Sequence, residues 1–346
     1  MCGPLLSPRW VVFCLLLVYG AAAAFAQGDP LQASRNGETL ALIPLESSAR
    51  LELPGGRTLT VALPERATVY SVVLLESGWI AAGTFPDAAG GGQRLFLLQG
   101  DGEGARPLAE PTGPVGSLRR GPVLLVEDGR LAGLAWLEGD GITSLSVRSA
   151  AWTGRRWQAT QQVSHPGPGS QLALAGAVLD DGSWLLAWSA FDGTADEIVW
   201  SRRVGGEWLP VRRVSARNLV PDIVPALTAT AGGGALLAWS RYNGRSYQLH
   251  LARFERGEWR KEKAAGPAGS FFPVFLGEPD HPRLLYMDAH PRAWSVLDLD
   301  PTGRVKGRTQ LSSPLERPIV SFEGDEVRMR WPNQKATAEA RLERIP

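Results

Sequence analysis

The sequence predicts an all-β fold built as a single β-propeller, and two repeated markers carry this prediction. Leu-Ala-Trp occurs three times at spacings of 52 and 51 residues, ending at Trp136, Trp188 and Trp239. A second tryptophan recurs at spacings of 51, as Trp157, Trp208 and Trp259. Between them lie short alternating apolar and polar segments, and the 40 Gly and 26 Pro supply many turns. A period near 50 made of short strands is typical of propeller blades.

Each clear repeat reads as one four-stranded blade. An apolar innermost strand meets a tight turn, the Leu-Ala-Trp strand follows, and then come a polar loop, a third strand, a glycine turn and an outer strand opened by the second Trp. The innermost strands are expected at residues 123–126, 172–179 and 224–230. Weaker repeats of the same outline are expected at about 67–112 and 271–313.

The two ends of the chain decide the predicted number of blades. Residues 38–63 alternate as short strands, and residues 318–322 and 327–331 begin a further blade near the end of the chain. An open ring would leave unpaired strand edges, so we expect the N-terminal strands to close it. If they complete the last blade, the propeller has six blades, which we favour. If both ends form separate blades, it has seven.

The first residues are typical of an export signal. Arg9 precedes an apolar core at residues 10–19, and Ala24-Phe25-Ala26 has the small-x-small cleavage pattern. The predicted domains are a signal peptide at 1–26, a linker at 27–37 and the propeller at 38–346. The alternative is an uncleaved anchor. Both cysteines, Cys2 and Cys14, lie in the signal, so the mature chain has no thiol for a disulfide, a zinc-thiolate site or a nucleophile.

Charge and hydropathy limit the partners. The chain has 36 basic and 35 acidic residues, and removal of Arg9 with the signal balances them. Nothing in this balance favours nucleic acid or an anionic membrane surface. After the signal, no apolar run is long enough to suggest membrane insertion, so we expect an exported protein, periplasmic or extracellular.

Residues 197–208, Glu-Ile-Val-Trp-Ser-Arg-Arg-Val-Gly-Gly-Glu-Trp, resemble a blade of the sialidase-like, BNR-repeat propellers. Ser201, Gly205 and Trp208 match the first, fifth and eighth positions of that family's Asp box, Ser-x-Asp-x-Gly-x-Thr-Trp. Arg203 stands at the Asp position, as do Trp152 and Phe254 in the neighbouring repeats. The resemblance covers residues 120–265 and implies a propeller whose Asp-box turns lie away from the active face.

The resemblance also implies what a sialidase would need: three arginines gripping a carboxylate, a Tyr nucleophile with a Glu partner, and an Asp acid/base. The family carries the first arginine in an Arg-Ile-Pro segment of its first blade. This chain has Thr68-Val69-Tyr70-Ser71 there instead. We therefore assign no catalytic residue and favour a protein that is not an enzyme.

One group of polar residues is the candidate ligand site. Loops between second and third strands, and loops between blades, gather on one face of a propeller around the channel mouth. Guanidiniums and a phenol from adjacent blades can there bind an anionic or sugar ligand. The alternative is that Asn243-Gly244 is a hairpin turn flanked by solvated charges. The predicted site residues are Asp192, Arg241, Tyr242, Arg245, His290 and Arg292.

Other constellations are weaker. Asp140, Asp192 and Asp196 could supply paired carboxylates for glycoside cleavage, but acids beside Gly are usually turn formers. The four His show no metal-binding spacing, and neither a metal nor a cofactor is predicted. The Leu-Ala-Trp tryptophans are expected to pack between blades. The second set, Trp157, Trp208 and Trp259, is expected to close the blades, with sugar stacking as the alternative.

The predicted function is a noncatalytic binding module that recognises a glycan or a protein partner through its loop face. One alternative is a divergent, sialidase-like glycoside hydrolase that uses Asp192, Tyr242 and the arginines. The other is an interaction scaffold with no small-molecule site. Because one fold hosts many functions, the choice depends on the geometry of the site.

Overall fold

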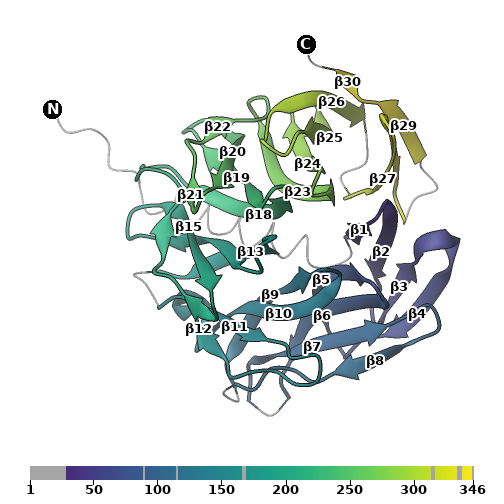
Figure 1. Cartoon of the computed structure of the whole chain (residues 1–346), viewed down its shortest axis with the longest axis vertical. Helices are drawn as coiled ribbons and strands as arrows, with labels where there is room; N and C mark the ends of the chain where they lie inside the picture. Colours follow the sequence, from purple (N-terminus) through teal and green to yellow (C-terminus); the bar gives the residue numbers. More distant parts are fainter. Residues whose placement is uncertain are drawn as a thin grey trace.

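The computed structural model describes residues 29–88, 90–113, 116–165, 169–312, 316–332 and 337–344. In this part of the chain, seven antiparallel sheets stand around a central axis as the blades of a propeller (Figure 1). The predicted signal peptide, residues 1–26, lies outside the described residues. Within them, no helix has the length and hydrophobicity needed to cross a bilayer.

We number the blades I to VII along the chain, and the first strand of each blade is the innermost. Blade I contains β1 (Leu31–Arg35), β2 (Glu38–Pro44), β3 (Ser48–Glu52), the short 3-10 helix η1 (Pro54–Gly56) and β4 (Thr58–Ala62). Blade II contains β5 (Thr68–Leu75), β6 (Gly78–Pro86), β7 (Gln93–Gly100) and β8 (Ala105–Leu108). Blade III contains β9 (Leu118–Glu127), β10 (Arg130–Gly139), η2 (Ile142–Ser144), β11 (Ser146–Ala151) and β12 (Gln161–Gln162).

The remaining blades follow the same order. Blade IV contains β13 (Gln171–Val178), β14 (Trp184–Phe191), β15 (Asp196–Val204), β16 (Glu207–Trp208) and β17 (Arg212–Arg213). Blade V contains β18 (Asp222–Thr230), β19 (Gly234–Tyr242), β20 (Tyr247–Glu255), β21 (Glu258–Trp259) and β22 (Lys263–Ala264). Blade VI contains β23 (Ser270–Glu278), β24 (His281–Ala289), β25 (Arg292–Leu299), β26 (Val305–Ser312) and β30 (Glu343–Arg344). Blade VII contains β27 (Ile319–Glu323), β28 (Glu326–Arg330) and β29 (Thr337–Arg341).

The all-β propeller is confirmed. Its described residues form seven blades, so the six blades that we favoured from the sequence are corrected to the alternative count. The N-terminal strands form blade I by themselves, and residues 319–341 form blade VII, so the two ends of the chain do not share a sheet. Figure 1 shows these first and last blades side by side. The predicted linker at 27–37 is corrected, because β1 lies within it as the innermost strand of blade I. Residue-by-residue alternation was too short there to distinguish a strand from a linker.

The repeated Leu-Ala-Trp segment has a packing explanation. Successive side chains of a strand point to opposite faces of the sheet, and both faces of a blade are covered by neighbours. In β14, Leu186 and Trp188 pack toward blade III, whereas Leu185 and Ala187 pack toward blade V. The three tryptophans of this repeat are fully buried between blades, as predicted.

The inner strands of several blades carry a bulge at the same height. The register shifts within the pairs β9–β10, β13–β14, β18–β19 and β23–β24. At these bulges the backbone has positive φ at Gly121, Ala173, Val224 and Phe272, with values from 49° to 56°. A bulge bends its strand and redirects the side chains beside it, so the four bulges together shape the wall of the central channel.

Candidate functional site

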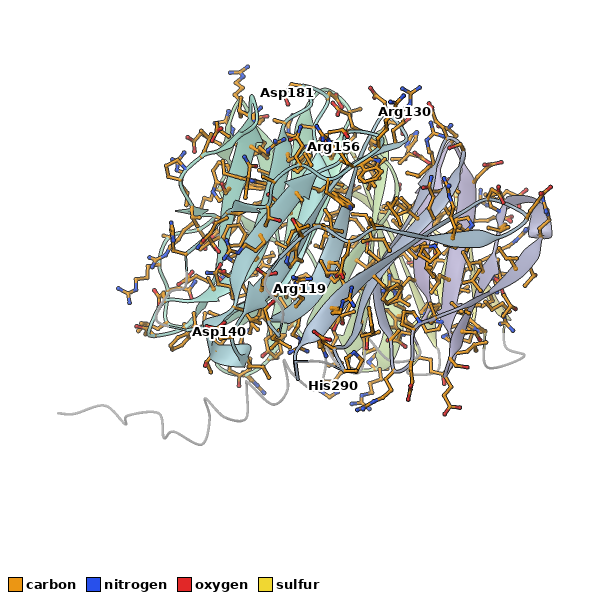
Figure 2. The ribbon with its side chains drawn as sticks, turned by 90° about the horizontal axis from the view of Figure 1, so that it is seen from below. Arg119, Arg130, Asp140, Arg156, Asp181 and His290 are labelled. Carbon is orange, nitrogen blue, oxygen red and sulfur yellow. The ribbon has the colours of Figure 1, made fainter. Side chains whose placement is uncertain are left out.

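The two ends of the propeller carry different loops. In the side view of Figure 2, Asp140 and His290 lie at one end, and Arg130, Arg156 and Asp181 lie at the other. The first end carries the loops between second and third strands and is called the loop face below. The second end carries the tight turns and is called the turn face. All six predicted site residues belong to segments of the loop face.

The Asp192 side chain stabilises the loop between β14 and β15. Its carboxylate accepts hydrogen bonds from the backbone N–H of Thr194 and Ala195 at 2.9 and 3.3 Å. Arg213 and Arg217 approach the other carboxylate oxygen at 2.9 and 3.0 Å. Burial acts to raise the pKa of Asp192, but these hydrogen bonds and the two guanidiniums hold that pKa below its ordinary value. Asp192 therefore closes its own turn as an ionised group.

Two further acids lie beside this turn. Burial, together with the charge of Asp192, raises the pKa of Asp196 to about 6. Glu197 is only 1% exposed, and burial raises its pKa as well. One of its oxygens accepts the backbone N–H of Asn218 at 3.0 Å, while the other has no hydrogen-bond partner among the described residues. Blade IV therefore holds two acids whose ionised forms are disfavoured.

Arg241 is a structural side chain. Its Nε and Nη2 donate to the two oxygens of Asp222 at 2.6 and 2.7 Å, and Asp222 is fully buried. Nη1 donates to Glu262 at 3.3 Å. The Nε1 of Trp239 completes the cluster by donating to Asp222 at 3.0 Å. The guanidinium of Arg241 is thus engaged inside blade V.

The remaining predicted residues lie at strand ends or in the adjoining turns. Tyr242 packs against Tyr247, with ring centroids 5.2 Å apart. Arg245 is exposed in a turn that the Asn243 side chain caps by accepting two backbone N–H groups. His290 and Arg292 are exposed at the turn between β24 and β25. No hydrogen bond or ion pair among the described residues joins these side chains to Asp192 or Arg241, so the predicted residues share a face without forming one cluster.

The second set of tryptophans packs against neighbouring strands or blades. The Nε1 of Trp157 donates to the carbonyl of Ala109, and the Nε1 of Trp208 donates to Ser149 at 2.9 Å. Trp259 packs against Phe254 and Trp200. This arrangement fits the blade-closing role expected for them. The described residues contain no group of three or more His, Cys, Asp or Glu placed to hold a metal ion.

A cavity of about 260 Å³ lies in the central channel near the loop face. Side chains from blades II to VI form its largely apolar wall, including Leu172 and Phe272. Tyr70, Arg120 and Arg317 add polar groups to this wall. Ligand sites are typically apolar hollows with a few convergent polar groups, and this volume lies just below their usual range of about 300–1,000 Å³.

The backbone around this cavity is strained. All four positive-φ bulge residues line it, and only one of them is Gly. Left-handed backbone costs about 1–3 kcal/mol at a residue such as Val224, because its branched Cβ crowds the carbonyl. Such strain persists only where the surrounding structure imposes it, and it concentrates at binding sites. The strained residues thus mark the same place as the cavity.

Two arginines line this cavity. Arg317 is 9% exposed, and burial lowers its pKa to about 10, which leaves it protonated at neutral pH. Asp29 is the acid that favours its charged form, and burial raises the pKa of Asp29 itself. Arg120 brings a second guanidinium from β9. An anionic group is therefore the ligand feature that this cavity favours.

The cavity residues were missed by sequence reasoning because they come from inner strands instead of loops. One signal was present: Pro follows the bulge residue in three blades, at Pro122, Pro225 and Pro273. Proline within a strand is confined to edges and bulges. These prolines could have indicated bulged inner strands at the channel.

Comparison with known proteins shows the fold alone. No protein-family model matches the sequence, and no curated protein matches it. Among solved structures, an ulvan lyase of polysaccharide lyase family PL25, bound to a GlcA-Rha3S unit, superposes with a TM-score of 0.60 at 10% identity, over 92% of this chain and 94% of that one. The lectin BP39L from Burkholderia pseudomallei has a TM-score of 0.60 at 14% identity, over 88% of this chain and 92% of the lectin. A puromycin-hydrolyzing peptidase from Mycobacterium tuberculosis has a TM-score of 0.57 at 16% identity, over 93% of this chain and 53% of that chain. A lyase, a lectin and a peptidase share this architecture, so the chain is a β-propeller similar in fold to carbohydrate-active and other proteins.

Proposed function

We propose that the protein is an exported, noncatalytic β-propeller that binds an acidic glycan, with the anionic group of the sugar in the central cavity of the loop face. The observation that carries this proposal is the cavity itself: a strained apolar wall with Tyr70, Arg120 and Arg317. A guanidinium pairs strongly with a carboxylate or sulfate, and more so where water is excluded. The apolar wall fits the C–H face of a sugar ring.

The fold neighbours support a glycan over other anions. One is a lectin, and another is a lyase bound to a glucuronate-containing unit. The noncatalytic part of the proposal rests on the loop face, where Asp192 is held by two arginines and Arg241 is held by Asp222. Groups engaged in this way are poor candidates for cleaving a glycosidic bond.

One observation favours the alternative, a divergent glycoside hydrolase. Asp196 has a pKa raised to about 6, and its neighbour Asp192 stays ionised. Carboxyls with pKa values driven apart by their surroundings are the acid and base of many glycosidases. A hydrolase of this kind would lose its activity on Asp196→Asn, whereas glycan binding in the central cavity would be unaffected.

The affiliation with sialidase-like propellers and the export of the chain belong to the same proposal. The degenerate Asp boxes at residues 152–157 and 201–208 support the affiliation, and the export pattern before Gln27 supports a periplasmic or extracellular location. Intact-mass spectrometry of the protein secreted from an expression host checks the latter. An N-terminus at Gln27 is expected, and an intact Met1 would contradict export by cleavage.

The test is a glycan-array screen followed by calorimetry with a uronate oligosaccharide and its carboxyl-reduced, neutral counterpart. We expect the acidic sugar to bind more tightly than its neutral counterpart. Arg120→Gln should weaken it at least about tenfold, because a hydrogen bond to a charged group contributes about 1.5–3 kcal/mol. Arg317→Gln should act in the same direction.

Arg292→Gln is the matched control, because Arg292 is exposed on the same face but outside the cavity. It should leave the affinity unchanged. Equal binding of the neutral sugar, or loss of binding on Arg292→Gln but not on Arg120→Gln, would contradict the proposed site. Absence of binding to any acidic glycan would favour the scaffold with no small-molecule site.

A further inference from the structure

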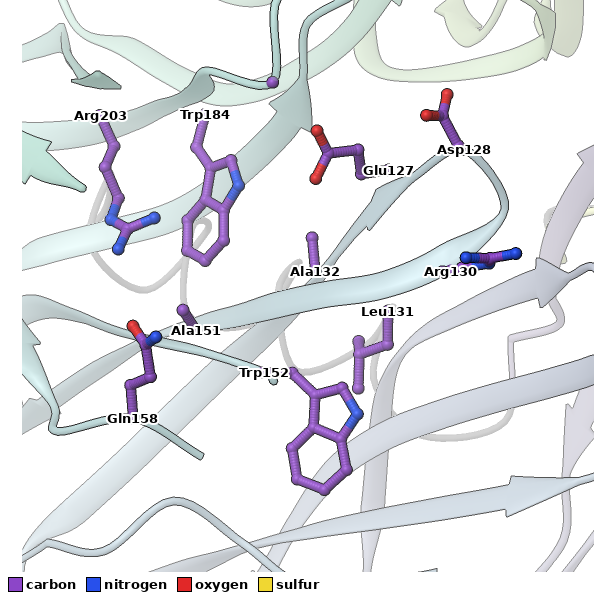
Figure 3. A pocket seen from close by; sticks show the side chains of 11 residues that line it. Glu127, Asp128, Arg130, Leu131, Ala132, Ala151, Trp152, Gln158, Trp184 and Arg203 are labelled. Carbon is purple, nitrogen blue, oxygen red and sulfur yellow. The ribbon is translucent and has the colours of Figure 1, made fainter. Parts of the chain in front are cut away.

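A second cavity lies on the other end of the molecule. It has a volume of about 420 Å³ and sits between blades III and IV on the turn face. Blade III supplies the turn of Glu127 and Asp128 together with Trp152, and blade IV supplies Trp184 and Arg203 (Figure 3). Its volume falls within the usual range of small-ligand sites, about 300–1,000 Å³.

The residues that build this cavity are departures from the repeat. Arg203 and Trp152 both stand at the Asp position of the degenerate Asp boxes, and Phe254 is their counterpart in blade V. Trp184 pairs with Arg203 across the strands, whereas its counterpart in blade V is Ala235, which pairs with Phe254. Between blades IV and V, Phe254 is 1% exposed and belongs to the apolar core. At the equivalent positions between blades III and IV, the side chains are an indole and a guanidinium, those of Trp184 and Arg203.

The aromatic walls are held in place. Trp152 is partly exposed and packs on Trp157, with ring centroids 4.9 Å apart. Trp184 is 4% exposed, and the edge of its ring contacts Trp208 at 6.4 Å between centroids. Both indoles are thus ordered by packing, so little conformational entropy is lost when a ligand binds.

The polar groups complement these walls. The guanidinium of Arg203 lies 4.5 Å from the Trp184 ring centroid, and its Nε donates to Gln161 at 3.2 Å. Burial lowers the pKa of Arg203. On the other side, Glu127 approaches the turn at Gly182, and no ion pair or hydrogen bond engages its carboxylate among the described residues. Figure 3 shows the Trp184 indole between Arg203 and Glu127, with Gln158 and Trp152 below.

The charged and aromatic groups of this cavity favour one class of ligand. The lining contains two acids, Glu127 and Asp128, and two arginines, Arg130 and Arg203, so it does not favour an anion. A sugar hydroxyl can donate to a carboxylate and also accept from a guanidinium. The C–H face of a pyranose ring can lie on the indole of Trp152, and aromatic surface of this kind is what apolar ligand faces pack on.

We propose that the cavity between blades III and IV is a second carbohydrate site, on the turn face, for a neutral pyranose ring, with Trp152 as the stacking wall and Glu127, Gln158 and Arg203 as hydrogen-bonding groups. It is independent of the acidic-glycan site in the central channel. The two sites lie at opposite ends of the molecule, so one protein can engage two glycan segments at once.

The experiment uses the intact protein and a panel of neutral methyl glycosides with gluco, galacto, manno, fuco and rhamno configurations. Saturation-transfer NMR and intrinsic tryptophan fluorescence report binding. At least one glycoside should bind with a Kd on the order of 1 mM, typical of about 4 kcal/mol of binding free energy. Absence of binding by every glycoside up to about 10 mM would overturn the proposal.

Variants locate the site. Trp152→Ala should abolish the signal, and Trp152→Phe should retain part of it because an aromatic wall remains. Glu127→Gln and Arg203→Gln should each weaken binding about tenfold, which corresponds to about 1.4 kcal/mol. Circular dichroism checks that each variant is folded. Unchanged binding in a folded Trp152→Ala protein would overturn the assignment.

Arg120→Gln separates the two sites. This change removes a guanidinium of the central cavity and touches no residue of the second one. Neutral glycosides should bind the variant as they bind the unmodified protein, even if the acidic glycan never binds. Loss of neutral-glycoside binding on Arg120→Gln would place that ligand in the channel and overturn the second site.

Discussion

Asp222 and Arg241 form an ion pair in which the acid is fully buried and the arginine side chain is 16% exposed. A buried pair contributes little net stability when it is intact, because desolvation offsets the attraction. Removing one partner is different, since the other charge is left buried and alone. One carboxylate oxygen of Asp222 accepts hydrogen bonds from both Arg241 and Trp239, so this site is sensitive to single substitutions.

Arg241→Ala is therefore expected to lower the free energy of unfolding by about 3–5 kcal/mol. Urea denaturation at neutral pH measures it. Arg245→Ala is the control four residues away, in an exposed turn, and should change stability by no more than about 0.5 kcal/mol. If Arg241→Ala removed glycan binding but kept full stability, Arg241 would be a ligand residue as the sequence predicted.

Asp196 leads to a prediction about pH. Its pKa is raised from the ordinary 3.8 to about 6, chiefly by burial and then by Asp192. The folded state binds the proton more tightly, so the stabilising contribution of this group is complete below about pH 4 and is lost as the pH rises through about 6. At neutral pH the buried charge costs at most about 3 kcal/mol.

Asp196→Asn should consequently raise the stability by about 1–3 kcal/mol at pH 7.5 and leave it nearly unchanged at pH 4. Thermal unfolding at the two pH values is the measurement. An equal gain in stability at both pH values would show that the Asp196 carboxyl does not titrate between them. That result would contradict the raised pKa of Asp196.

At the level of the element, the bulged inner strands connect packing with the central cavity. Each bulge puts one residue into left-handed backbone at the cavity wall, and three blades place a non-glycine residue there. Gly121 is the one that adopts this backbone without strain. A Cβ added to Gly121 would meet no atom within 4 Å, so its substitution isolates the backbone cost from any clash.

Gly121→Ala should lower the free energy of unfolding by about 1–2 kcal/mol, the cost of a left-handed L-residue. Gly104→Ala provides the control, because a Cβ there also meets no atom and the backbone is not left-handed. That control should be neutral or slightly stabilising. Equal stabilities for the two variants would remove the case for strain at the cavity wall.

At the level of the whole molecule, the ring is closed by side chains and not by a shared sheet. Large apolar clusters join most neighbouring blades. Between blades I and VII the buried apolar cluster is small and consists of Ala41, Ile43 and Ile319. Gln32 reinforces this seam, because its amide donates to the carbonyl of Val320 and accepts the backbone N–H of Val320 at 2.9 Å. Local opening follows the places with least buried apolar contact, so the ring should open first at this seam.

Gln32→Ala is expected to speed amide hydrogen exchange in β2 and β27 by about tenfold while exchange in β14 stays unchanged, because opening of the seam leaves the central blades closed. Hydrogen exchange with mass spectrometry resolves these segments. Ser34→Ala, on the same strand, is the control and should leave both rates unchanged. A uniform acceleration across all blades would indicate global unfolding and contradict a weak seam.

The sequence by itself determined the architecture. Each blade must bury both of its faces, so a buried tryptophan recurs once per blade, at Trp136, Trp188 and Trp239. The alternation of side chains along each strand makes this requirement visible in the sequence. The sequence also placed Asp192, Arg241 and His290 on one end of the propeller, since strand order alone decides which loops share a face.

The tertiary structure decided the blade count and the partners of the charges. Whether residues 31–62 complete the last blade or stand alone depends on how side chains such as Ile43 and Ile319 meet, which no local pattern encodes. Arg241 and Arg317 have the same side chain, yet one is engaged by Asp222 and the other lines a cavity. The energy of a charge depends on its burial and on its neighbours across the fold, so only the assembled ring separates a structural arginine from a candidate for binding.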